Sequence, residues 1–111
     1  MNPDLRKMHS NLVALMRSLE ESIDTAPTAA AITAITEQMV EINTRVTAIG
    51  RVLLTQQTEE IARCAKAVAE AMPGIEGEIA DLQDCQRMVR SVAALLGTVD
   101  DAVRLATLAL D

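Results

Sequence analysis

Cys64 and Cys85 are the residues of this chain with the most reactive side chains. Two thiols can act as a redox couple when the fold brings their Cα atoms within about 7 Å, and the helical hairpin predicted below places both near one level. Neither residue has the Cys-x-x-Cys spacing that lowers a thiol pKa. We expect buried reduced thiols, with a redox couple of Cys64 and Cys85 as the alternative.

The candidates for metal chemistry are His9, which is the only histidine, and four acidic residues at Glu76, Glu78, Asp81 and Asp84. A zinc site takes four ligands, and both cysteines are distant from His9 in sequence. The acidic group lacks the glycine turn and twelve-residue loop of an EF-hand. Negative charge near a helix N-terminus is the simpler explanation, so the sequence predicts no metal site and no cofactor.

Motifs of enzymes are missing as well. The sequence has no glycine-rich phosphate loop, no G-x-S-x-G elbow and no Ser/His/Asp set. A carboxylate pair for acid–base catalysis needs a cleft that raises one pKa, and long aliphatic helices do not predict one. The sequence therefore indicates a protein that is not an enzyme.

Composition narrows the class of partner. The 111 residues are 50% hydrophobic, contain no aromatic residue and carry a formal net charge of −6. An acidic surface without stacking side chains argues against binding to nucleic acid or to anionic membranes. No signal peptide is recognisable, and the longest uncharged stretch (25–36) is too short to span a bilayer. We expect a cytoplasmic protein.

Apolar residues recur three and four positions apart along the chain, which predicts helices. If the chain turns near Pro27, five residues of the first helix face five of the second. The pairs are Leu5 with Ile49, Met8 with Val46, Leu12 with Ile42, Leu15 with Met39, and Leu19 with Ile35. This pattern is typical of an antiparallel hairpin with a coiled-coil-like seam.

We predict one helical domain over residues 1–111, with helices over 3–24, 28–72 and 75–110. Pro27 marks the first turn, and Pro73-Gly74 ends the long second helix. The alternative is a break within residues 55–58, where Thr58 would cap a new helix.

Two helix glycines, Gly50 and Gly97, fall opposite each other in this hairpin. Glycine costs about 1 kcal/mol against alanine inside a helix. The pair therefore suggests a close backbone approach or a hinge, with coincidence as the alternative.

The predicted fold is all-α: an antiparallel three-helix bundle drawn out into a long helical hairpin. Its two-helix tip would leave an apolar patch exposed, and such patches often mark interfaces. The patch consists of Leu53, Leu54, Ile61, Val68, Val89 and Val92. Pairing of two tips would give a four-helix bundle, so we expect a homodimer.

These features favour a non-enzymatic module for protein–protein interaction that offers a groove to a partner's amphipathic helix. Long hairpins poor in aromatic residues resemble, in general form, small bacterial adaptor, scaffold or export-chaperone subunits. A redox- or metal-responsive helical sensor that uses Cys64 and Cys85 is the alternative function.

Overall fold

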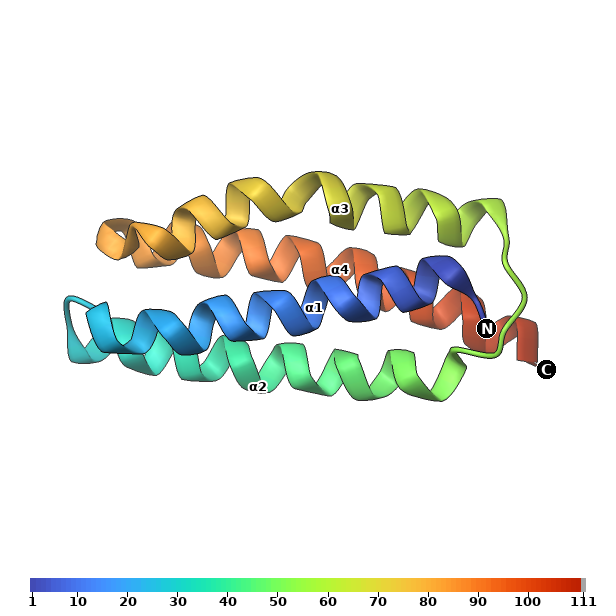
Figure 1. Cartoon of the computed structure of the whole chain (residues 1–111), viewed down its shortest axis with the longest axis horizontal. Coiled ribbons are helices and arrows are strands. Elements are labelled where there is room, and N and C mark those ends of the chain that lie inside the picture. The colour runs from blue at the N-terminus through green and yellow to red at the C-terminus, as the bar shows by residue number, and fades with distance from the viewer. Residues whose placement is uncertain (111) are drawn as a thin grey trace.

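The structure, a computed structural model, describes residues 1–110 as helices joined by short connections (Figure 1). The helices are α1 (Pro3–Ser22), α2 (Ala29–Val52), α3 (Glu59–Ala80) and α4 (Cys85–Leu110), with 3-10 turns η1 (Ile23–Thr25) and η2 (Leu82–Asp84). No strand occurs in these residues, so the all-α prediction is confirmed for them. Asp111, the last residue of the predicted domain, lies outside the described residues.

Residues 1–110 form two antiparallel hairpins, α1–α2 and α3–α4, packed into one bundle. Beyond its hairpin partner, α1 packs mainly against α3, and α2 mainly against α4. Helices α2 and α3 are therefore diagonal neighbours, although they follow each other in the chain. Figure 1 shows both hairpin turns at one end of the bundle and the α2–α3 connection crossing the other end. The bundle measures 46 × 21 × 17 Å.

Side-chain caps fix where the helices begin. Asn2 Oδ1 accepts hydrogen bonds from the backbone N–H groups of Asp4 and Leu5, at 3.0 and 3.1 Å. Thr28 Oγ1 accepts from the N–H of Ala31 at 3.0 Å. These caps satisfy N–H groups that have no partner within the helix. Helix α1 begins at the predicted residue and ends two residues before the predicted end.

The prediction of one continuous helix over 28–72 is wrong, and the alternative break is present. Helix α2 ends at Val52, and Thr58 Oγ1 caps α3 by accepting from the N–H of Ile61 at 3.2 Å. The connection is held at the bundle end because Asn2 N donates to the carbonyl of Leu53 at 2.7 Å. A helix running straight on would leave the apolar face of α3 in water, whereas the break folds that face back onto α1.

The predicted helix end at Pro73-Gly74 is also wrong, because Pro73 lies inside α3. Figure 1 shows the ribbon of α3 as one uninterrupted helix. Proline removes one helical hydrogen bond at a cost of about 3 kcal/mol. Met72, Ile75 and Ile79 flank it on the buried face, and each such side chain contributes about 1.5–3 kcal/mol on burial. Core packing therefore outweighs the proline. The turn falls instead between Asp81 and Asp84.

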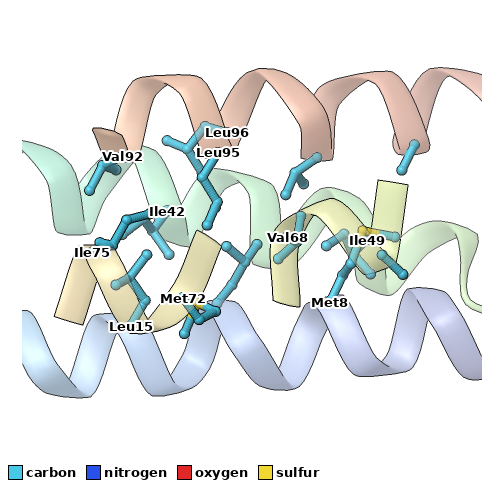
Figure 2. Packing of buried hydrophobic residues seen from close by; sticks show 14 of the residues in the cluster. Met8, Leu15, Ile42, Ile49, Val68, Met72, Ile75, Val92, Leu95 and Leu96 are labelled. Atoms are coloured by element: carbon cyan, nitrogen blue, oxygen red, sulfur yellow. The ribbon is translucent and has the colours of Figure 1, made fainter. Parts of the chain in front are cut away.

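The core receives side chains from all the helices of residues 1–110, as Figure 2 shows. Leu12 and Ile42 come from the first hairpin, Val68 and Val92 from the second, and each is at most 1% exposed. The four helices of this stretch replace the predicted three, and a single chain builds the bundle. No helix of these residues has the length and apolar character needed to cross a membrane.

One ion-pair network joins the two hairpins outside the core. Arg45 of α2 donates to both carboxylate oxygens of Asp100 on α4, at 3.0 and 3.1 Å, and it also pairs with Glu41. Two donors on two acceptors fix the relative position of the helices. Asp100, and to a lesser extent Glu41, raise the pKa of Arg45 because they stabilise the charged guanidinium, while burial opposes the effect.

Candidate functional site

A groove opens on the outer face of the second hairpin, between α3 and α4. Its volume is about 300 Å³. The residues that line it are Ala67, Val68, Ala71, Gly74, Ile75 and Glu78 of α3, with Ser91, Ala94, Leu95 and Thr98 of α4. Val68, Ile75 and Leu95 are at most 3% exposed and belong to the bundle core. The bottom of the groove is therefore the apolar interior of the bundle.

Small side chains keep this groove open. Ala67 and Gly74 on α3 and Ala94 on α4 are exposed, and Ala71 and Ser91 are half-buried. A Cβ atom built on Gly74 meets nothing within 4 Å. Neither helix therefore extends a large side chain across the hollow, and another helix can approach the backbone closely.

Glu78 is the only ionisable side chain among the residues lining the groove. Its Oε1 atom accepts a hydrogen bond from Ser91 Oγ at 3.0 Å, and Arg87 Nε lies 4.0 Å from the same oxygen. Its Oε2 atom is buried and has no hydrogen-bond partner within residues 1–110. A buried carboxylate oxygen without a donor is costly. Glu78 therefore places one incompletely hydrogen-bonded carboxylate at this end of the groove.

An acidic hollow continues from that end. Gly74 and Glu78 line both, and the hollow adds Asp81, Asp84 and Arg87, with a volume of about 480 Å³. Asp84 Oδ1 caps α4 by accepting from the N–H of Arg87 at 3.0 Å. The groove thus leads from an apolar stretch into a polar, mainly acidic one.

Charge is unevenly distributed along the bundle. The half near the hairpin turns, residues 13–40 and 70–97, holds nine acidic and three basic residues, and therefore the whole net charge of −6. The acidic residues are Glu20, Glu21, Asp24, Glu37, Glu70, Glu76, Glu78, Asp81 and Asp84. The groove lies mostly in this half. The negative electrostatic potential of this half attracts cations and positively charged partners.

The six residues predicted as a dimer interface do not form an exposed patch. Ile61, Val68 and Val92 are at most 1% exposed, because α1 and α2 cover the face that the predicted tip left open. Leu53 and Val89 are half-buried against the same core. Leu54 alone is well exposed, at 84%, in the α2–α3 connection. The structure does not test the homodimer, but the patch that suggested it lies mainly inside the chain.

The structure does not bring the two cysteines together. Both are free thiols. Cys64 lies in the first half of α3, and Cys85 begins α4 beyond the far end of that helix. Ala80 follows Cys64 by sixteen positions, which at 1.5 Å per residue places the two about 24 Å apart along the helix. The predicted common level depended on a turn at Pro73-Gly74, and without it this bundle cannot join the pair in a disulfide.

Burial raises the pKa of the Cys64 thiol, and nearby Asp101 adds to the effect, while Arg63 and Arg104 oppose it. The folded protein therefore favours the protonated, unreactive form of Cys64. This setting is the opposite of the electropositive surroundings that activate a thiol.

His9 lies on the outer side of α1, where it lines a shallow hollow with Ser10, Val13, Ala14 and Arg17. In the part of the chain that the structure describes, no group of three or more His, Cys, Asp or Glu side chains is placed to hold a metal ion. Glu78, Asp81 and Asp84 line one hollow at the α3–α4 turn, while Glu76 lies on the α1 side of α3.

The groove was not predicted from the sequence, although the sequence contains one signal for it. Ala67, Ala71 and Gly74 are spaced four and three apart, which puts three small residues on one helix face. Their role becomes visible only when α3 is known to pack against α4. Searches against family models, curated proteins and solved structures find no match to this chain.

Proposed function

We propose that this chain is a non-enzymatic module for protein–protein interaction, of the kind used as a small adaptor, scaffold or chaperone subunit, and that its α3–α4 groove receives a helix of a partner protein. The groove carries the proposal. It combines an apolar floor with small side chains on both walls, which is the form of site that accepts an amphipathic helix.

The dimensions of the groove support a helical occupant. Its α3 wall runs from Ala67 to Glu78, a distance of about 16 Å, or three helical turns. An amphipathic helix presents side chains at positions i, i+3, i+4 and i+7 over that length. The single carboxylate of Glu78, without a second acid–base group in the groove, does not suggest catalysis.

A photo-crosslinking experiment tests the proposal. A benzophenone amino acid replaces Ala94 in the groove or, as a matched control, Ala14 on the outer face of α1; both alanines are exposed. After irradiation in an extract of the source cells, mass spectrometry identifies the adducts. We expect one defined protein attached at position 94 and not at position 14. No adduct at position 94, or the same adducts at both positions, would contradict the proposal.

The stoichiometry of the protein alone is part of this proposal. A two-fold dimer through the α3–α4 groove would place the same patch of both copies together, and therefore two acidic halves. The like charges of two acidic halves brought together in this way repel each other. We expect a monomer, in place of the homodimer predicted from the sequence. Light scattering should give the mass of one chain across the micromolar range, and twice that mass would contradict the expectation.

A further inference from the structure

We infer that the partner helix is basic: it places apolar side chains on the floor of the α3–α4 groove and a lysine or arginine against Glu78. This inference rests on the proposed function and adds the chemistry of the partner. Three observations support it.

The first observation is the state of Glu78. Ser91 holds Oε1 in a fixed position at 3.0 Å, while Oε2 has no partner within residues 1–110. Arg87 is 4.0 Å from Oε1 and its side chain is mostly exposed, so it does not neutralise the carboxylate closely. Glu78 is the one charged residue lining the groove, and its side chain is 19% exposed, so an ammonium or guanidinium group entering there would meet this carboxylate and pair with it through a charge-assisted hydrogen bond.

The second observation is the field around the groove. The half of the bundle that contains most of it holds nine acidic and three basic residues. The acidic hollow with Asp81 and Asp84 adjoins the groove directly at Glu78. A basic helix would be attracted along its length, and an acidic helix or a second copy of this chain would be repelled.

The third observation is the separation of apolar and acidic surface along the groove. The stretch from Ala67 to Ile75 is apolar or small on the α3 wall, and the carboxylate follows at Glu78. A partner that matches this order has apolar side chains over two turns and a basic residue at the next turn. This order sets the direction in which the helix lies, because the reversed helix would place its cation over Ala67.

Two synthetic peptides test the inference. Each has eighteen residues with the same leucine and alanine face, one with lysines and the other with glutamates on the polar face, and each carries a fluorescent label. Binding to the full chain is followed by fluorescence anisotropy at 50 and 500 mM NaCl. We expect the lysine peptide to bind, to lose at least tenfold in affinity at the higher salt, and the glutamate peptide not to bind.

Three variants locate the site. Glu78→Gln keeps an acceptor for Ser91 and should weaken binding about tenfold, the effect of losing a charged hydrogen bond. Glu76→Gln makes the same change of charge on the α1 side of α3 and should change the affinity less than twofold. Gly74→Leu fills the groove, where a Cβ meets nothing within 4 Å, and should abolish binding. Circular dichroism verifies the fold of each variant.

Several outcomes would overturn the inference: no binding of the lysine peptide, equal binding of both peptides, equal effects of Glu78→Gln and Glu76→Gln, or full binding by Gly74→Leu. The crosslinking experiment distinguishes a failure of the proposed function from a failure of the basic-helix inference. If position 94 captures a partner and any of these outcomes occurs, the interaction module stands and the basic helix is wrong. If position 94 captures nothing, the proposed function itself fails.

Discussion

The two hairpins of this bundle share a pattern of buried positions and have different outer faces. Several positions 56 apart in α1 and α3 are buried in both helices, as are several positions 57 apart in α2 and α4. The pairs are Leu5 with Ile61, Leu12 with Val68, Leu19 with Ile75, Ile35 with Val92, Ile42 with Val99, and Ile49 with Ala106. Both hairpins therefore present the same kind of face to the shared core.

The difference lies in the residues beside that core. In α1, Met8 and Leu15 are fully buried. At the equivalent places in α3, Cys64 and Ala71 are only half-buried. In α3 the next residues, Ala65 and Met72, are buried instead, and small side chains line the open groove beside them. Small side chains therefore accompany the groove of the second hairpin, which we propose as the site for a partner.

Truncation in the core should affect the first hairpin more. Leu12→Ala removes a fully buried side chain and should lower the free energy of unfolding by about 3 kcal/mol, whereas Val68→Ala at the matching position should lower it by about 2 kcal/mol. Urea unfolding measures both. A larger loss for Val68→Ala would show that the second hairpin contributes more to the core than its burial indicates.

Removal of the helix-interior proline should stabilise the second hairpin. Pro73→Ala restores one hydrogen bond in α3, so the free energy of unfolding should rise by about 1–3 kcal/mol. Arg17 is the exposed counterpart in α1, and Arg17→Ala should change the stability by less than about 0.5 kcal/mol. Thermal melts followed by circular dichroism compare the two. A loss of stability in Pro73→Ala would mean that α3 needs the proline for its path.

The two helix glycines should prove replaceable. Cβ atoms at Gly50 and Gly97 meet nothing within 4 Å, which excludes the suggested close approach of backbones. Gly50→Ala and Gly97→Ala should each raise the free energy of unfolding by about 0.5–1 kcal/mol, through helix propensity alone. Urea titration of each variant checks this. A decrease for Gly97→Ala would indicate a role for glycine that the packing does not show.

The smallest expected effect concerns Cys64. Its raised thiol pKa means that the folded chain holds the proton more firmly than the unfolded chain does. Stability contributed by this group is therefore complete below the ordinary thiol pKa of about 8.5 and declines as the pH rises above it. Cys64→Ser should reduce that decline slightly in urea titrations at successive pH values.

Alkylation provides a second measure of the same thiol. Cys64 should react with iodoacetamide more slowly in the native protein than in urea, as followed by mass spectrometry. Equal rates in both conditions would mean that burial does not protect it, and a native disulfide with Cys85 would contradict the arrangement of the helices.

Much of the first hairpin can be predicted from the sequence. The seam of Leu5, Leu12 and Leu19 indicates α1 directly, and the caps at Asn2 and Thr28 lie where helix-start preferences place them. In this region the local signals and the core packing agree. The spacing of the apolar residues, together with the single turn at Pro27, then determines how the two helices pair.

The second hairpin could not be predicted in the same way, because its local signals disagree with its packing. Pro73-Gly74 is the strongest local helix-ending signal there, yet both residues lie inside α3, between Met72 and Ile75, whose side chains are buried in the core. The true break at 53–58 contains neither proline nor glycine. A turn misplaced by about eight residues shifts every predicted α3–α4 pairing. This shift explains why the two cysteines were wrongly predicted to lie at one level and why the groove was not predicted.

A distance between Thr36 and Glu70 tests the folding of α3 back onto the first hairpin. Both residues are exposed and lie in the half of the bundle near the hairpin turns. Nitroxide labels enter through Thr36→Cys and Glu70→Cys, with Cys64→Ser and Cys85→Ser, and pulsed electron resonance measures their separation. The bundle predicts about 20 Å between the two Cα atoms. A continuous helix would hold them about 51 Å apart, beyond the 46 Å length of the whole bundle, and that result would contradict the fold and the groove together.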